Sequence, residues 1–159
     1  MAKKDDKTNV MRLLDKAGIP HGEITYGPEV GTVGTEVARA IGEDEKHVFK
    51  TLVTVGKTGT HYVFVIPVAE ELDLKKAAKA SGEKSIEMIK SKELLPLTGY
   101  IHGGCSPIGM KKFFTTFVHE SARDEEEIVF SAGKIGYQVK LKPEHLEKMI
   151  RLNYADLIV

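Results

Sequence analysis

Apolar residues recur at helical spacing twice near the start of the chain, with a short alternating stretch between them. Residues 8–17 place Val10 and several later apolar residues on one face, and Gly18 follows, which predicts a helix that ends there. Residues 22–27 fit a short strand. Residues 35–41 fit a second helix, with the threonine that begins this range as its N-cap.

The strongest strand pattern of the chain comes next. Residues 47–55 and 60–68 are rich in β-branched and aromatic side chains, and the glycine-containing stretch between them predicts a tight turn. Residues 62–66 are apolar on both faces, which indicates a central strand covered on both sides. A helix is expected at 73–80, with the aspartate that begins it as the cap.

The second half of the chain is predicted to consist mainly of short strands. These expected strands lie at 85–89, 99–102, 113–119, 128–130 and 137–141. One helical turn is expected at 91–95, a solvated acidic turn at 122–127, and a last helix from Pro143 to about residue 152. Several strands adjoin without helices between them, so we predict an α+β fold with a mixed, barrel-like sheet flanked by helices.

Composition restricts the class of protein. The chain has 159 residues, of which 42% are apolar, so we expect one folded domain over residues 1–159, with residues 1–7 frayed. The formal net charge is zero, from 23 basic and 23 acidic residues, which argues against a general polyanion binder. A single cysteine excludes an internal disulfide. Without a secretory signal or a long apolar span, we expect a cytoplasmic protein that does not enter a membrane.

Lys50 stands within the first of the two long strands, in the run Val-Phe-Lys-Thr-Leu. A lysine among residues that should pack a core is either an exposed edge-strand residue or a cation in a cleft that binds phosphate or polarises a carbonyl. The strand pattern alone favours the exposed residue. Thr51 adds a hydroxyl, on the opposite face if the strand is regular.

Two glycine-rich stretches, 103–109 and 131–136, make the interpretation of Lys50 as a cation in a cleft more favourable. In the first, Gly103 and Gly104 permit close backbone approach, and Pro107 restricts the chain beside a serine. The second lies between two predicted strands. Each stretch alone is most simply a connecting loop or a hairpin. Together with a cation, they offer backbone N–H groups and hydroxyls to a carbonyl or carboxylate.

The other reactive residues predict no site of their own. Cys105 as a nucleophile would need His102 or His119 beside it as a base with an orienting partner, so a small buried apolar residue is favoured. The histidines lack metal-ligand spacing, and we expect no metal and no cofactor. Lys111 and Lys112 are either solvent-exposed residues or contacts to nucleic acid phosphates.

Four segments together resemble the YbaK/EbsC family of Cys-tRNA(Pro) deacylases, which are related to the editing domain inserted in bacterial prolyl-tRNA synthetases. These segments are 48–52, 67–80, 98–109 and 131–136. Their order and spacing extend the resemblance over nearly the whole chain. It implies hydrolysis of mischarged Cys-tRNA(Pro), and of Cys-tRNA(Cys) as a further substrate, with the tRNA 3′ end and prolyl-tRNA synthetase as partners.

The resemblance also implies roles for individual residues. Lys50 corresponds to the functionally critical strand lysine of the family. Substrate-binding roles fall on residues of the strand and the loops: Tyr26, Thr51, Gly103, Gly104, Ser106, Pro107, Gly109, Ser131, Gly133, Lys134 and Gln138. Backbone N–H groups near 104–106 would stabilise the oxyanion, and the attacking group would be water or the thiol of the substrate itself.

The second glycine-rich stretch departs from the family pattern. Many members have a small residue, a basic residue and an aspartate where this chain has Ala132, Ile135 and Gln138. Two alternatives therefore stay open beside Cys-tRNA(Pro) editing. One is a non-catalytic or regulatory module that binds acylated tRNA or a synthetase, and the other is an editor of a different small amino acid.

Overall fold

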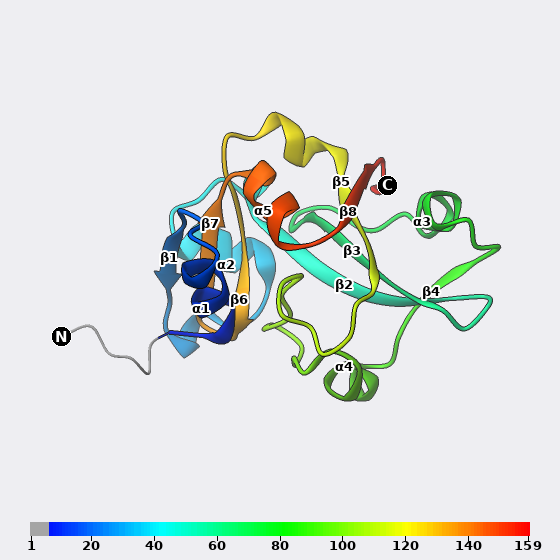
Figure 1. Ribbon diagram of the computed structural model, residues 1–159, viewed down its shortest axis with the longest axis horizontal. Coiled ribbons are helices and arrows are strands. Elements are labelled where there is room, and N and C mark those ends of the chain that lie inside the picture. Colours follow the sequence, from blue (N-terminus) through cyan, green and yellow to red (C-terminus); the bar gives the residue numbers. More distant parts are fainter. Residues whose placement is uncertain (1–6) are drawn as a thin grey trace.

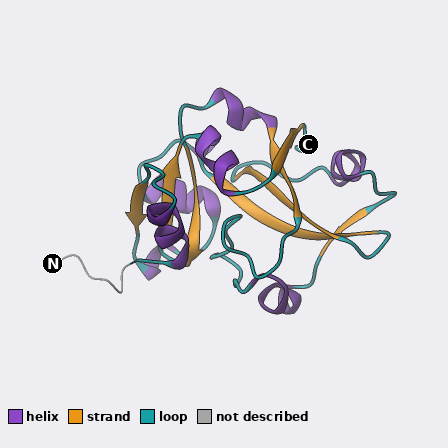
Figure 2. Cartoon of the chain, viewed as in Figure 1, coloured by secondary structure: helices purple, strands orange, loops and turns teal. Residues whose placement is uncertain are grey.

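The computed structural model describes residues 7–159 and forms an α+β fold of two sheets with helices around them (Figures 1 and 2). The helices are α1 (Asn9–Lys16), α2 (Gly34–Ala40), α3 (Leu74–Ser81), α4 (Ser91–Thr98) and α5 (Pro143–Met149). The strands are β1 (Gly22–Thr25), β2 (Phe49–Gly56), β3 (His61–Pro67), β4 (Ile86–Met88), β5 (Thr115–His119), β6 (Ile128–Lys134), β7 (Tyr137–Leu141) and β8 (Leu152–Ala155). Three short 3₁₀ helices lie at Pro28–Val30, Glu45–His47 and Glu120–Asp124. Of the residues predicted to fray, 1–6 lie outside the described part of the chain.

The strands divide between a small antiparallel sheet and a larger mixed sheet. The small sheet has the order β1-β7-β6, and the larger has the order β4-β2-β3-β5-β8, in which β3, β5 and β8 run parallel. The central position predicted for residues 62–66 is confirmed, because β3 lies between β2 and β5. The mixed sheet is confirmed as well, but the strands do not close into one barrel. The two sheets meet at a bridge between Val48 and Val129.

Apolar side chains fill the space between the sheets and cover the outer face of the larger one. The main cluster joins α1, both sheets and α5, and includes Leu14, Val65, Phe130 and Leu146. On the other face of the larger sheet, Phe64 stacks on Phe117 with ring centroids 5.5 Å apart, under α3. Among the described residues, no helix has the length and apolar character that crossing a bilayer requires.

Local signals fix the ends of the helices that the sequence predicts well. The Thr8 hydroxyl accepts the Met11 N–H at 3.2 Å and begins α1. The Asp73 carboxylate accepts two backbone N–H groups at the start of α3, and Gly82 ends that helix in the left-handed conformation. The cap predicted for α2 is wrong, because the helix begins one residue earlier and its N-cap is Val33.

Three further expectations differ from the structure. Residues 99–102 form no strand, because Gly99 adopts a positive φ and the Gly104 N–H closes a turn onto the Ile101 carbonyl oxygen. Helix α4 continues past its proline to Thr98, whose hydroxyl donates to the Leu94 carbonyl oxygen at 2.8 Å. The last helix stops at Met149, and the following residues form β8 beside β5.

The segment 131–136 is part of a β-hairpin rather than a free loop. Strand β6 extends to Lys134, and its pairing with β7 shifts register between Ser131 and Lys134. The alternative that this segment is a hairpin is therefore correct. The irregularity turns the end of the hairpin away from a regular ladder, as β-bulges do near functional sites.

The Phe64–Phe117 stack gives a test of the fold. We expect Phe64→Ala to lower the free energy of unfolding by about 3–5 kcal/mol, because a fully buried aromatic leaves a cavity that cannot collapse. Phe113, which is 66% exposed, serves as the control. Phe113→Ala should change the free energy of unfolding by less than about 0.5 kcal/mol. Urea unfolding of both variants measures this; equal effects would contradict the assigned core.

Candidate active site

A cavity of about 150 Å³ lies where the two sheets meet. Every residue from Val48 to Leu52 lines it, so the cavity surrounds the start of β2. Residues of β6 and β7, the segment before α2 and the segment after α4 complete its wall. Six of the residues predicted from the sequence line this cavity: Tyr26, Lys50, Thr51, Gly103, Ser131 and Gln138.

Lys50 is a half-buried cation at this cavity. It is paired with Ile66 of β3, and its ammonium donates to the Val68 carbonyl oxygen at 3.4 Å. Burial lowers the pKa of Lys50, and the negative charges of Glu71 and Glu70 oppose this effect only in part. The strand pattern favoured an exposed lysine. The structure instead places Lys50 in the wall of a cavity, where a charge interacts more strongly with a bound ligand than in open solvent.

Thr51 brings an unsatisfied polar atom to the same cavity. Its hydroxyl oxygen is buried and has no hydrogen-bond partner in the described part of the chain. Neighbouring strand residues face opposite sides of a sheet, and Lys50 and Thr51 reach one cavity because it extends around the start of β2. A buried hydroxyl without a partner is costly in the free protein. It is satisfied if a ligand supplies the missing hydrogen bond.

The two glycine-rich segments contact each other beside the cavity. A Cβ on Gly104 would lie 3.1 Å from the Ile135 backbone nitrogen, so a larger residue would push this backbone approach apart. Gly103 has a φ of +87° and packs on Thr32, another residue of the cavity wall. The Gly104 N–H already donates to the Ile101 carbonyl oxygen at 3.0 Å, which removes it from the expected oxyanion donors.

The other residues predicted to bind substrate lie outside the cavity wall. They are Gly104, Ser106, Pro107, Gly109, Gly133 and Lys134. Ser106 is fully buried, and its hydroxyl accepts the Ile108 N–H at 3.3 Å, which shapes the loop. The exposed Lys134 places its ammonium 5.3 Å from the centre of the Tyr137 ring. In this structure these residues hold the segments in place or face solvent.

Tyr100 is a positioning residue that the sequence analysis missed. Its hydroxyl donates to the Ile108 carbonyl oxygen at 2.5 Å, and its ring fills the space beside Gly109 and Gly133. Burial raises the pKa of Tyr100 to about 12. Tyr100 thereby links both glycine-rich segments. An aromatic residue just before a glycine pair was the available signal.

Cys105 lines the cavity as a neutral thiol. It is 9% exposed, and burial raises its pKa to about 12, so it carries no thiolate at neutral pH. The interpretation as a small buried residue is confirmed. His119 is no base for it, because its Nδ1 accepts the Leu157 N–H at 3.2 Å away from the cavity. His102 lines the cavity mouth and is exposed.

Two departures from the family pattern have structural roles here. Ala132 is fully buried in the main apolar cluster. Ile135 packs its side chain 3.5 Å from the position that a Cβ on Gly103 would take. The third departure, Gln138, is 6% exposed and lines the cavity wall.

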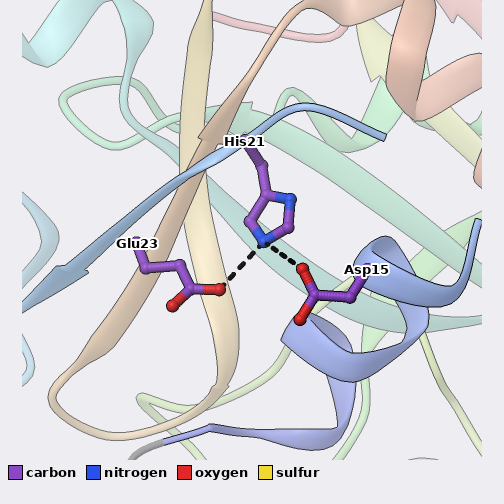
Figure 3. Close-up of side chains that lie close together, drawn as sticks. All are labelled: Asp15, His21 and Glu23. Atoms are coloured by element: carbon purple, nitrogen blue, oxygen red, sulfur yellow. Dashed lines mark hydrogen bonds and ion pairs between the residues drawn. The ribbon is translucent and has the colours of Figure 1, made fainter. Parts of the chain in front are cut away.

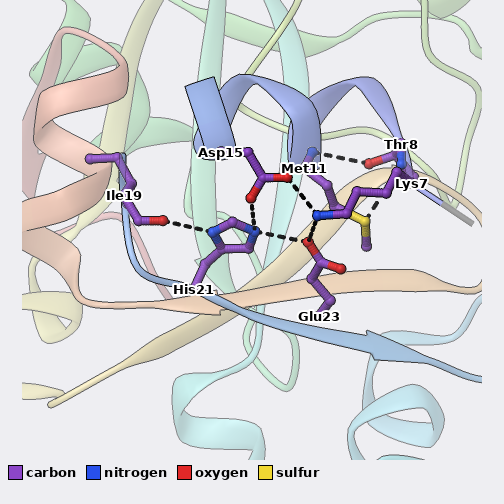
Figure 4. Close-up of polar contacts among 7 residues, drawn as sticks. All are labelled: Lys7, Thr8, Met11, Asp15, Ile19, His21 and Glu23. Carbon is purple, nitrogen blue, oxygen red and sulfur yellow. Dashed lines mark hydrogen bonds and ion pairs between the residues drawn. The ribbon is translucent and has the colours of Figure 1, made fainter. Parts of the chain in front are cut away.

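A separate polar cluster joins α1 to β1 (Figure 3). Asp15, His21 and Glu23 bring ligand-type atoms within 4.8 Å of one another, an arrangement that the sequence spacing did not predict. The Lys7 ammonium contacts the carboxylates at 2.5 and 3.2 Å, and His21 Nδ1 donates to the Ile19 carbonyl oxygen (Figure 4). Lys7 thus already supplies a cation to the cluster. The expectation that the protein binds no metal stays a prediction.

Comparison with known proteins points to one family. The model of the aminoacyl-tRNA editing domain matches residues 27–149. An Enterococcus faecalis protein named EbsC, a candidate Cys-tRNA(Pro)/Cys-tRNA(Cys) deacylase, is 45% identical over 99% of this chain and 98% of its own. The proline–tRNA ligase of Shouchella clausii is 31% identical over a matched region. This region covers 69% of this chain and 19% of that enzyme.

Solved structures share the fold. A candidate trans-editing enzyme for prolyl-tRNA synthetase superposes with a TM-score of 0.86 at 23% identity, over 99% of both chains. A hypothetical protein superposes with a TM-score of 0.86 at 20% identity, over 96% of this chain and 100% of the other. The overall fold of this chain is therefore found in other proteins.

The lowered pKa of Lys50 predicts how stability depends on pH. Between this lowered pKa and the ordinary value of 10.5, the unfolded chain binds more protons at Lys50 than the folded protein does. The contribution of Lys50 to the free energy of unfolding therefore rises with pH across that window. We expect Lys50→Met to be more stable than wild type at pH 7, with a difference that shrinks as pH rises toward 10.5.

Urea unfolding at pH 7 and pH 10 measures this difference. Lys57→Met, at an exposed turn position, is the matched control and should show no such gain. A Lys50→Met variant that is less stable than wild type at pH 7 would show that the ammonium is stabilising.

Proposed function

The chain belongs to the aminoacyl-tRNA editing domain family, and from this premise we propose that it hydrolyses the ester of mischarged Cys-tRNA(Pro) at the cavity beside Lys50. One observation carries the proposal: the half-buried Lys50 lines a cavity of about 150 Å³. The similarity to a candidate Cys-tRNA(Pro)/Cys-tRNA(Cys) deacylase names the substrate class and extends it to Cys-tRNA(Cys).

The cavity volume fits the aminoacyl group. A cavity of this volume holds one benzene-sized molecule, which suits a small aminoacyl group. Prolyl-tRNA synthetase distinguishes similar small amino acids by only a few kcal/mol at most, and a second hydrolytic site corrects the errors. A small cavity on a separate protein suits such a second site.

Lys50 supplies positive charge where negative charge develops. Attack on the ester carbonyl carbon places charge on the carbonyl oxygen, and an ammonium in a partly desolvated cavity stabilises this oxyanion. The Lys50 side chain is already held toward the cavity by the Val68 carbonyl oxygen. Thr51 also lines the cavity, and its hydroxyl would bond a polar group of the aminoacyl moiety once the side chain turns toward the ligand.

The attacking atom is either a water oxygen or the substrate sulfur. In both routes a bond forms to the carbonyl carbon, the ester C–O bond breaks, and the ribose oxygen leaves with a proton. Cys105 takes no part as a nucleophile, because its thiol stays protonated. Comparison of Cys-tRNA(Pro) with Ser-tRNA(Pro) separates the routes, since only the sulfur route requires the thiol.

Prolyl-tRNA synthetase is the partner that we propose for this reaction in the cytoplasm. Part of this chain is similar to part of a proline–tRNA ligase, and the zero net charge gives little general attraction to tRNA. Capture of the mischarged tRNA at the synthetase would offset weak affinity. Co-purification that recovers tRNA but never synthetase would count against this partnership.

Deacylation by Lys50→Ala tests the site directly. We expect kcat for Cys-tRNA(Pro) to fall by roughly 100-fold or more, the usual effect of removing an oxyanion donor. The variant should stay folded, because the lysine makes only one long hydrogen bond. Lys57→Ala is the control and should keep wild-type activity.

The same assay separates catalysis from binding alone. An enzyme accelerates loss of the cysteinyl group, whereas a non-catalytic module slows its spontaneous hydrolysis. Wild-type turnover in Lys50→Ala would remove this residue from the mechanism.

Thr51→Val should stabilise the folded protein and weaken its binding of substrate. The change removes a buried hydroxyl without a partner and keeps the shape, so the free energy of unfolding should rise by about 1 kcal/mol. The KM for Cys-tRNA(Pro) should also rise, because the substrate loses a hydrogen bond. Thermal unfolding and steady-state kinetics measure the two effects; a stabilised variant with unchanged KM would leave Thr51 without a role in binding.

A further inference from the structure

Two surface grooves lie at one end of the larger sheet, outside the cavity beside Lys50. One groove has a volume of about 570 Å³ and is lined by Phe113 and by residues 147–151. The other has a volume of about 220 Å³ and is lined by residues of the segment 107–116 and by Ile150. Phe113 and Ile150 belong to the walls of both, so the two grooves adjoin.

Parallel pairing of β5 with β8 brings the walls of these grooves together (Figure 1). The register places Thr116 opposite Leu152, and parallel strands begin at the same end of a sheet. The segment that precedes β5 therefore lies beside the segment between α5 and β8. A side-chain contact agrees with this placement, because the Arg151 guanidinium lies over the Phe113 ring, 5.8 Å from its centre.

The grooves combine an exposed aromatic ring with basic side chains. Phe113 is 66% exposed, and the three basic side chains that line the grooves are exposed as well. None of these three forms an ion pair within residues 7–159. Glu147 is the one acidic residue among the described lining residues, and it already accepts a hydrogen bond from a tyrosine hydroxyl at 2.8 Å. We call the ring and the three cations the basic aromatic surface: Lys112, Phe113, Lys148 and Arg151.

We propose that the basic aromatic surface binds single-stranded RNA of the tRNA substrate. Proteins that bind single strands without reading their sequence stack bases on exposed aromatic rings and pair lysine and arginine with the phosphates. Three cations and one acid attract a polyanion locally, although the whole chain has zero net charge. The identification of this RNA as tRNA rests on the proposed function.

An acidic protein segment is the other polyanion that these cations could bind. The exposed ring favours RNA, because a nucleobase stacks on an aromatic face. A carboxylate gains nothing comparable there, since the face of an aromatic ring carries partial negative charge. The combination of ring and cations therefore fits a nucleic acid strand better than a run of acidic side chains.

The segment 103–109 connects this surface to the cavity. Gly103 and Cys105 line the cavity, whereas Pro107 and Gly109 line the smaller groove. Cys105 and Pro107 are two residues apart in the chain, so at most about 7 Å separates their Cα atoms. The surface is therefore within reach of a tRNA whose acylated end enters the cavity.

Fluorescence anisotropy with a labelled single-stranded RNA of about 12 nucleotides tests the surface without any reaction. We expect Phe113→Ala to weaken binding at least about 5-fold, because the strand loses the stacking of one base. Met88→Ala removes an exposed apolar side chain from β4 and is the control, which should keep wild-type affinity.

The salt dependence of the same binding tests the cations. Three phosphate contacts predict that log K falls with log[salt] with a slope of about −2, since each contact to a single strand contributes about −0.7. The double variant Lys148→Ala, Arg151→Ala should reduce the slope to about −0.7. The control Lys75→Ala, Lys79→Ala removes the same charge from exposed positions of α3 and should leave the slope unchanged.

Wild-type affinity in Phe113→Ala, or an unchanged slope in the Lys148→Ala, Arg151→Ala variant, would overturn the proposed RNA surface. A poly-glutamate peptide is the probe for an acidic protein segment. If this peptide binds as tightly as the RNA and also loses affinity in the double variant, the surface docks protein and the RNA proposal fails. Cooperative urea unfolding of the variants confirms that they fold, as expected for changes at exposed positions.

Deacylation separates failure of the surface from failure of the proposed function. We expect the KM for Cys-tRNA(Pro) to rise at least about 5-fold in Phe113→Ala. If wild type accelerates deacylation but its RNA binding does not depend on the surface, the surface is wrong and the function stands. If RNA binds at the surface and no tRNA is deacylated, the proposed function is wrong and the surface is still an RNA site.

Discussion

The cavity depends on a close approach of two backbone segments. At Gly104 the chain passes so near Lys134 and Ile135 that a Cβ would lie 3.1–3.3 Å from backbone atoms. Tyr100 holds the same two segments from the other side through its ring and its hydroxyl. A larger residue at position 104 would move the backbone itself, because the nearest atoms do not belong to a flexible side chain. The wall of the cavity, and with it the surroundings of Lys50, follows from this contact.

The groups that we assign to substrate are also poorly satisfied in the free protein. Lys50 loses hydration and has its pKa lowered, and the Thr51 hydroxyl is buried without a partner among the described residues. Each feature opposes folding, and neither is needed to pack the surrounding apolar cluster. Proteins commonly retain such local costs where a ligand relieves them. The fold tolerates both because the sheets on either side are fully packed.

Local sequence predicted the elements whose signals are local. The hairpin of β2 and β3 and the cap of α3 follow from patterns within a few residues, and the structure confirms them. Strand β8 could not be found in this way, because it exists through parallel pairing with β5, and its short apolar run also fits the end of a helix. Residues 99–102 show the reverse: they have strand-like side chains but a turn takes their backbone hydrogen bonds.

The candidate site was predictable to a similar extent. Lys50, Thr51 and Gln138 could be named from residue type and resemblance, and all three line the cavity. Leu94 and Thr32 carry no chemical signal of their own, and their positions in the wall depend on how distant segments pack.

The pairing of β1 with β7 has a consequence for how the chain folds. Gly22 lies opposite Lys140, so β1 can join the small sheet only after almost the whole chain between them is available. Closing such a long loop costs conformational entropy before any contact is gained, and folds rich in distant pairings fold slowly. During synthesis β1 emerges early and waits with unpaired backbone groups, while the hairpin of β2 and β3 can form from neighbouring residues. The β2–β3 hairpin can therefore form early, and the pairing of β1 with β7 is a late step of folding.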